Sequence, residues 1–148
     1  MTSAKALICS IIGPFGTSGE VLAEAVDQAS TLLSSEGDLP IGFQWKRDLF
    51  RAMGEKSQKK PETLRKAAAR TTHKVYDALQ KDGGQMMEII GAELKEMPSP
   101  ASMMTYLAYY VRFEQPYFAF MRRRSRQKQK SGPPNRSDID GCKEARNA

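Results

Sequence analysis

The sequence predicts an all-α protein: a compact bundle of about six short helices followed by a basic, disordered C-terminal tail. Three observations lead to this prediction. The chain has 148 residues, of which 40% are hydrophobic, which is enough for one modest core and too few for two. Apolar residues recur at helical intervals along most of the chain, and no alternating segment of useful length indicates a strand. Glycine, proline and capping residues separate these apolar stripes.

The first two helices are expected over residues 4–12 and 17–33. In the first, apolar residues follow the i, i+3, i+4, i+7, i+8 spacing of one helix face, and Gly13 ends the pattern. Thr17 and Glu20 have the spacing of a capping box, in which each side chain accepts a hydrogen bond from the other residue's backbone N–H. This spacing predicts where the second helix begins, and one apolar stripe runs along the rest of it.

The third and fourth helices are expected over residues 41–54 and 61–81. Four apolar residues, each four positions from the next, are expected to form the buried face of the third helix: Ile41, Trp45, Leu49 and Met53. Pro61 suits the first turn of the fourth helix, because the backbone N–H that proline lacks is not needed there. The polar, basic residues 55–60 form the connection between the two helices.

A fifth helix is expected over residues 86–97, and a sixth begins at Pro100 and is interrupted by Pro116. A last helical segment runs from Tyr117 into a group of arginines. The short connections between these segments make neighbouring helices roughly antiparallel.

The chain is expected to divide into two parts. Residues 1–121 form the helical domain, and residues 122–148 form a basic, disordered tail. The end of the chain, from residue 131 onward, lacks an apolar face that could pack against the domain.

Positive charge is concentrated in two stretches of the sequence. The chain carries 23 Lys and Arg against 17 Asp and Glu, for a formal net charge of +6. Residues 1–45 and 82–121 are net acidic, at −4 and −3, whereas residues 46–81 carry eleven bases and four acids. The run 122–130 (RRRSRQKQK) holds six bases and no acid. Like charges at this density repel one another, so we expect a polyanionic partner that neutralises them.

Few residues of the sequence are suited to catalysis or metal binding. Two cysteines, Cys9 and Cys142, and one histidine, His73, argue against a disulfide framework, a four-thiolate zinc site and a histidine-pair metal site. The glycine-rich residues 13–19 lack the Gly-Lys-Ser/Thr ending of a phosphate-binding P-loop, and they open an acidic helix. We therefore expect no catalytic residue, no metal and no cofactor, and we predict that the protein is not an enzyme.

The sequence gives no signal for membrane insertion or secretion. Its apolar runs fall short of the ~20 residues that a membrane span needs, and residues 1–14 lack a clear signal-peptide cleavage site. Free cysteines fit a reducing compartment. We expect a cytoplasmic protein, with the nucleus as the alternative if the basic run is a localisation signal.

The fourth helix and the loop before it form a ridge of cations. Lys and Arg side chains spaced along a helix can follow a row of phosphates, because they displace condensed counterions on binding. The candidate phosphate contacts of this ridge are Lys56, Lys59, Lys60, Arg65, Lys66, Arg70 and Lys74. The same pattern is also typical of an ordinary solvated helix face, and Asp77 within the row weakens the functional interpretation.

The run that follows the domain is the stronger signal. Its candidate phosphate contacts are Arg122, Arg123, Arg124, Arg126, Lys128 and Lys130. Three functional interpretations compete with that of a solubilising tail: a nucleic-acid-binding arm, a nuclear localisation signal and a polybasic membrane anchor. We favour the nucleic-acid arm, because a second basic zone lies in the domain and because arginine forms the better fork for phosphate.

Aromatic residues crowd the segment before this run. Four of them are candidates for contact with bases or with a neighbouring subunit: Tyr109, Tyr110, Phe113 and Tyr117. Aromatic rings beside arginines can stack on unpaired bases, and Tyr and Arg are also enriched at protein interfaces. Simple core packing is the alternative for about half of the aromatic residues in this segment.

These observations favour a non-catalytic nucleic-acid-binding protein that holds the phosphate backbone as a small subunit of a larger nucleoprotein assembly. RNA or another single-stranded nucleic acid is preferred to duplex DNA, and other subunits or further copies of the chain are expected partners. Two alternatives stay open. One is a protein–protein scaffold or adaptor, and the other, less favoured, is a matrix-like peripheral membrane protein that uses the polybasic run.

Overall fold

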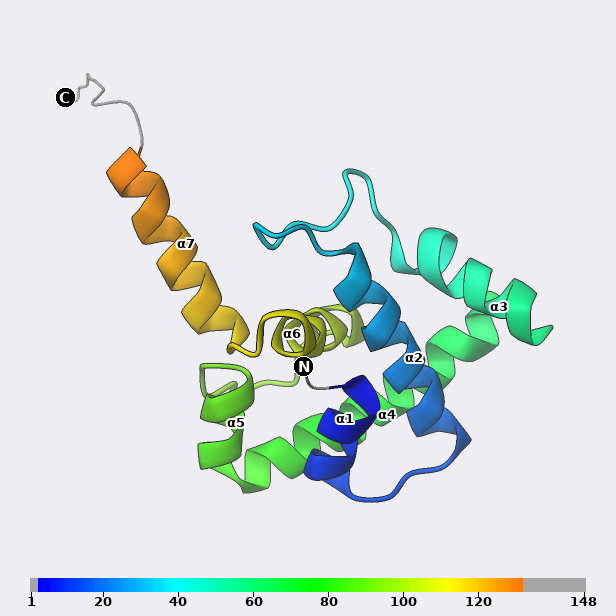
Figure 1. The fold of residues 1–148 in the computed structure, drawn as a ribbon. Helices are drawn as coiled ribbons and strands as arrows, with labels where there is room; N and C mark the ends of the chain where they lie inside the picture. The colour runs from blue at the N-terminus through cyan, green and yellow to red at the C-terminus, as the bar shows by residue number, and fades with distance from the viewer. Residues whose placement is uncertain (1–2, 132–148) are drawn as a thin grey trace. The chain divides into compact units, whose positions relative to one another are not determined.

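The computed structural model describes residues 3–131, and all regular secondary structure in this range is helical. The elements are α1 (Ala4–Ile12), α2 (Thr17–Leu32), the π-helix η1 (Trp45–Phe50), α3 (Arg51–Ser57), α4 (Pro61–Lys81), α5 (Gly83–Ile89), α6 (Pro100–Phe113) and α7 (Tyr117–Ser131) (Figure 1). This confirms the all-α prediction. The chain forms two compact units, Met1–Phe118 and Ala119–Ala148, which we describe separately.

The core of the first unit lies between α2, α4 and α6. Helix α2 packs against both of the others, and α1 packs against α2 and α4 (Figure 1). Leu22, Val26, Val75, Leu79 and Leu107 are completely or almost completely buried at these contacts. Burial of a side chain of this size stabilises a fold by about 1.5–3 kcal/mol. The apolar stripes of the sequence therefore correspond to the observed core in these three helices.

Short polar residues and prolines fix the starts of several helices. The side chains of Ser3, Asp82 and Ser99 accept hydrogen bonds from backbone N–H groups of the first turns of α1, α5 and α6, at 3.1 Å in each case. Pro61 and Pro100 occupy the first turns of α4 and α6. The start of α4 is therefore as predicted.

Helix α2 begins without the expected capping box. Its N-cap is Gly16, which has no side chain to accept a hydrogen bond. The ring of Phe15 instead packs over the first turn, where a Cβ atom placed on Gly19 would lie 2.2 Å from the Phe15 Cδ1 atom. Apolar packing thus replaces the reciprocal hydrogen bonds predicted for Thr17 and Glu20.

The third predicted helix is wrong at its start. Residues 40–44 form a turn, in which the Phe43 N–H donates to the Pro40 carbonyl at 3.0 Å and Gly42 has φ of +76°. Ile41, expected in the core, is fully exposed, with a relative accessibility of 104%. The helix begins only at Trp45, and its first turn is a π-turn in which the Arg51 N–H donates to the Lys46 carbonyl.

The fifth predicted helix is shorter than expected. Helix α5 ends at Ile89, and Gly91 follows with φ of +90°. Two contacts hold the following segment in an irregular conformation: the Phe118 N–H donates to the Ile90 carbonyl at 3.1 Å, and the Tyr76 hydroxyl donates to the Leu94 carbonyl at 2.9 Å. These tertiary hydrogen bonds override the helical spacing of residues 90–97.

The structure corrects part of the predicted tail. Helix α7 continues to Ser131, so residues 122–131 are helical rather than disordered. Arginine, lysine and glutamine are strong helix formers, which explains why this polar run continues the helix. The remaining residues of the predicted tail, 132–148, lie outside the described part of the chain.

Candidate nucleic-acid interface

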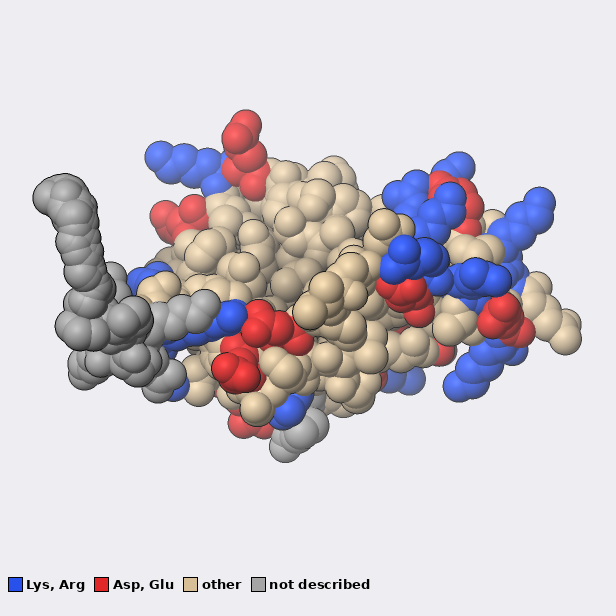
Figure 2. All heavy atoms as spheres, turned by 90° about the horizontal axis from the view of Figure 1, so that it is seen from above, with Lys and Arg blue, Asp and Glu red and all other residues tan. Residues whose placement is uncertain are grey.

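Basic side chains of the first unit gather over η1, α3 and the start of α4. We call this surface, formed by the cations of residues 46–66, the basic end. Figure 2 shows it on the right, where blue side chains surround a few red ones. Its cations are Lys46, Arg47, Arg51, Lys56, Lys59, Lys60, Arg65 and Lys66.

A tight turn between α3 and α4 positions two lysines of the basic end, Lys59 and Lys60. Gln58 adopts the left-handed conformation with φ of 60°, and the Lys59 N–H donates to the Gly54 carbonyl at 3.0 Å. Only glycine fits at position 54, because a Cβ atom there would lie 2.5 Å from the Lys59 carbonyl oxygen. The turn leaves an open, shallow hollow of about 510 Å³, whose charged lining is Arg51, Glu55, Lys59 and Lys60. Three cations and one carboxylate therefore surround this hollow.

All three carboxylates of the basic end lie beside its cations. The Glu55 Oε2 atom is 3.9 Å from the Arg51 Nε atom, and the other two, Glu62 and Asp48, also form hydrogen bonds. Glu62 accepts from the Arg65 Nε atom at 3.2 Å and lies 3.2 Å from the Lys46 Nζ atom. The hydrogen bonds from Arg65 and then Lys46 lower the pKa of Glu62 to about 2. In the same way, the hydrogen bonds from the Arg47 side chain and the Gln44 backbone lower the pKa of Asp48 to about 2. Both carboxylates therefore stay ionised and offset part of the positive charge.

An exposed stripe of α4 extends the basic surface. Lys66, Arg70, Lys74 and Lys81 lie on the solvent side of the helix, and none of them has an ion-pair partner among residues 3–131. At 1.5 Å per residue, this stripe is about 22 Å long. Asp77, the one acid of the stripe, is paired with His73, with 3.3 Å between its Oδ2 atom and the imidazole Nδ1 atom.

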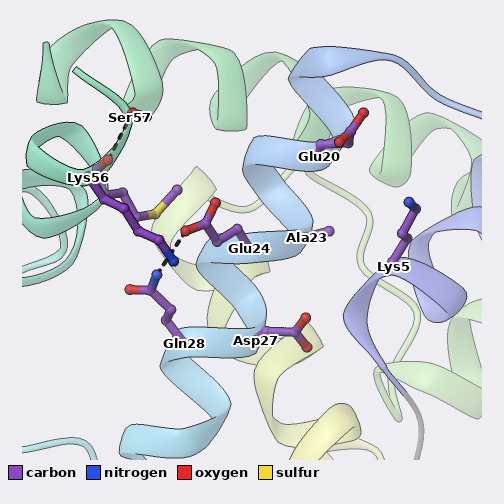
Figure 3. Close-up of a pocket in the computed structure, with 9 residues that line it drawn as sticks. Lys5, Glu20, Ala23, Glu24, Asp27, Gln28, Lys56 and Ser57 are labelled. Carbon is purple, nitrogen blue, oxygen red and sulfur yellow. Dashed lines mark hydrogen bonds between the residues drawn. The ribbon is translucent and has the colours of Figure 1, made fainter. Parts of the chain in front are cut away.

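Lys56 has a different environment from the other predicted contacts. It lines a groove of about 600 Å³ together with acidic residues of α2, and Figure 3 shows it reaching from α3 toward Glu24 and Gln28. Glu20 and Asp27 line the same groove. The neighbouring carboxylates reduce the attraction of Lys56 for an anion, so it is the weakest of the predicted phosphate contacts.

The arginines of the predicted arm lie on α7. Arg122, Arg123 and Arg126 are exposed and fall within about 100° around the helix axis. Arg124 lies on another side of the helix and is half-buried. The side chains of Lys128 and Lys130 lie outside those that the structure describes.

The predicted aromatic contacts pack against one another in the first unit. Tyr109 is buried, with 4% of its surface exposed, and its hydroxyl donates to the Gly37 carbonyl. The Tyr109 ring also contacts the rings of Phe113 and Tyr117, with centroids 5.7 and 4.8 Å apart. The prediction for Tyr109 is therefore wrong, because its ring is not available to a base or a second subunit. Tyr110, Phe113 and Tyr117 are half-buried.

A second aromatic pair borders the basic end, and the sequence reasoning missed it. The rings of Phe43 and Trp45 meet edge to face, with centroids 5.3 Å apart and planes at 78°. Both residues are half-buried, and Lys46 and Arg47 follow directly in the chain. The four-residue spacing had assigned Trp45 to the core. The signal that could have revealed the pair is this aromatic–aromatic–cation sequence, Phe-Gln-Trp-Lys-Arg.

Two further features of the described residues bear on the chemistry of the chain. No three His, Cys, Asp or Glu side chains within residues 3–131 are arranged to hold a metal ion. None of the helices in that range has the length and apolar character needed to cross a membrane.

Comparison with protein-family models, curated proteins and solved structures finds no match for this chain.

Proposed function

We propose that this chain is a non-catalytic nucleic-acid-binding protein that holds the phosphate backbone through its basic end and the exposed stripe of α4. It acts as a small subunit of a larger nucleoprotein assembly, with RNA or another single strand as the preferred ligand. The observation that supports this proposal is the gathering of Lys and Arg side chains over η1, α3 and the start of α4 (Figure 2). Two carboxylates of this surface have a lowered pKa and are already paired: Glu62 with Lys46 and Arg65, and Asp48 with Arg47.

The free cations of this surface set the expected strength of binding. Six cations of this surface are exposed and have no ion-pair partner among the described residues: Lys59, Lys60, Lys66, Arg70, Lys74 and Lys81. Each phosphate contact to a single strand contributes about −0.7 to the slope of log affinity against log salt concentration. Six such contacts give a slope of about −4, so binding should depend strongly on salt concentration. Because the contacts are to phosphates, the sequence preference should be weak.

A charge-matched pair of double variants tests the proposal. We expect Lys59→Gln with Lys60→Gln to weaken binding of a labelled single-stranded oligonucleotide and to reduce the salt slope by about 1.4. The control, Lys5→Gln with Lys95→Gln, removes the same charge from two exposed positions outside the basic end. Fluorescence anisotropy over a range of salt concentrations measures both. Equal effects of the two double variants would mean that only net charge matters, and a slope near zero for the unmodified protein would refute the proposal.

A scaffold or adaptor is the second candidate, and the groove in Figure 3 favours it. Glu20, Glu24 and Asp27 of α2 present negative charge there, so that a basic surface of another protein or of a second copy would be complementary to it. Light scattering distinguishes the two functions. Self-association that added oligonucleotide does not change would support the scaffold.

A further inference from the structure

We propose that Phe43 and Trp45 form a stacking platform for unpaired bases, so that the chain selects single-stranded over duplex nucleic acid. This inference rests on the proposed function, because the basic end supplies the phosphate contacts beside the platform. It assigns a role to two aromatic residues that the sequence had not marked as contacts, and it replaces Tyr109, which is buried.

The two rings have the geometry of a surface platform. They meet edge to face at 5.3 Å, so the face of one ring remains uncovered by the other. Both residues are half-buried, so each is partly packed against the first unit and keeps part of its surface accessible. Every nucleobase has a flat π face, and stacking on protein aromatics is therefore strong and tolerant of sequence.

Hydrogen bonds hold the backbone on both sides of Phe43. The Arg47 guanidinium donates to the Gly42 carbonyl at 2.7 Å and to the Asp48 carboxylate. The same Asp48 carboxylate also accepts a hydrogen bond from the Gln44 backbone N–H, with 2.8 Å between the nitrogen and the Oδ2 atom. Arg47 and Asp48 thus clamp the residues that flank Phe43. A platform that is ordered before binding loses less conformational entropy when the ligand arrives.

The surrounding charge favours a nucleic acid as the ligand of this platform. Lys46 and Arg47 follow Trp45 in the chain, and Arg51 begins the next helix. Each of the three is paired with one carboxylate, so the phosphate contacts come from Lys59 and Lys60 of the basic end, which are unpaired within residues 3–131. An unpaired strand offers a base face and a phosphate within one nucleotide, which matches an aromatic ring beside a cation. In a duplex the base faces are covered by neighbouring base pairs, so a duplex can use only the cations. The exposed Ile41 near the platform also makes an anionic lipid surface an outcome to be tested.

Trp45 is the only tryptophan of the chain, so its fluorescence reports directly on the platform. We expect a single-stranded oligonucleotide to quench this fluorescence and a duplex of the same length to leave it nearly unchanged. Phe43→Leu should weaken single-strand affinity by about 5- to 150-fold, the range for loss of one stacked base, with little effect on duplex affinity. Phe15→Leu, which changes a half-buried aromatic before α2 that is not among the candidate contacts, is the matched control and should leave both affinities unchanged.

A second variant guards against a folding defect in the first. Asp48→Asn keeps the side-chain shape and weakens the clamp on Gln44 and Arg47, so it should reduce the quenching and the single-strand preference while circular dichroism shows an intact helical fold. Asp48 acts here as a positioning residue. Quenching and preference that survive both variants would overturn the platform.

The outcomes separate this inference from the proposed function. Salt-dependent oligonucleotide binding without Trp45 quenching, or with equal affinity for single strand and duplex, would refute the platform and leave the proposed function standing. Absence of any oligonucleotide binding would refute both. Quenching by vesicles of anionic lipid, with none by oligonucleotides, would show that the platform inserts into a membrane surface instead.

Discussion

The Glu62 carboxylate shows how single residues set the charge of the basic end. It lies in the first turn of α4, where the helix dipole also favours a negative group, and it binds both Lys46 and Arg65. One acid thereby holds two cations in fixed positions and reduces the charge they present to a polyanion. Glu62 therefore stabilises the fold locally but lowers the affinity of this surface for an anion.

Glu62→Gln should raise the affinity for nucleic acid and lower stability at neutral pH. The folded-state pKa of Glu62 is about 2, below its ordinary value of 4.5. Ionised Glu62 therefore stabilises the fold above pH 4.5, and this contribution is lost as the pH falls from 4.5 to about 2. Thermal melts of both proteins across this range should show the difference in Tm closing toward pH 2. A Tm difference that stays constant with pH would contradict the assignment. Oligonucleotide binding by the variant should have a salt slope steeper by about 0.7 for each cation released.

The contact between α6 and the loop after α2 shows how tertiary interactions position whole elements. The buried Tyr109 hydroxyl of α6 donates to the Gly37 carbonyl, which is 72 positions away in the sequence. This contact ties the loop that leads toward Phe43 and η1 to the core. The order of the basic end therefore depends in part on a helix that carries none of its cations.

Tyr109→Phe removes this hydrogen bond and should lower the free energy of unfolding by about 1 kcal/mol. The loss should reach about 3 kcal/mol if the Gly37 carbonyl stays buried without a partner. Tyr110→Phe, a half-buried neighbour on the same helix, is the control and should cost less. Urea unfolding followed by circular dichroism measures both. Equal losses for the two variants would show that the Gly37 contact contributes nothing specific.

The sequence predicted some elements well and others poorly, for a physical reason. Helix α4 has a strong apolar stripe, a starting proline and a clear end at Asp82, so local signals suffice to define it. At residues 40–50, the spacing of Ile41 and Trp45 indicated a continuous helix, but the turn at Gly42 and the hydrogen bonds of Asp48 start the helix later. Tertiary hydrogen bonds of this kind leave no periodic signal.

The sequence also indicated only part of the candidate interface. Most of the α4 cations could be found from the sequence, because a charged row on a helix follows from spacing alone. The burial of Tyr109 and the half-buried pair of Phe43 and Trp45 could not, because both depend on how α6 and the loop before η1 pack in three dimensions.

For the whole molecule, the question is whether the α7 arginines contribute to binding in addition to the basic end. Replacing Arg122, Arg123 and Arg126 by Gln should reduce the salt slope by about 2, if each contacts one phosphate. Combined with Lys59→Gln and Lys60→Gln, the two reductions should add when both surfaces bind the same oligonucleotide. Anisotropy titrations of the three variants at several salt concentrations measure this. A combined variant with the same slope as one of its parents would show that only the surface altered in that parent contacts the oligonucleotide.

The uneven placement of charge in the first unit has a consequence for the kinetics of association. Residues 46–81 are strongly positive, whereas the stretches before and after them are net negative, and the cations gather over one end (Figure 2). Such a unit has a permanent dipole moment, and the field of a polyanion exerts a torque on it before the two molecules touch. If a nucleic acid is the ligand, as proposed, collisions would be biased toward productive orientations, and both the encounter rate and the lifetime of the complex should fall as salt screens the field.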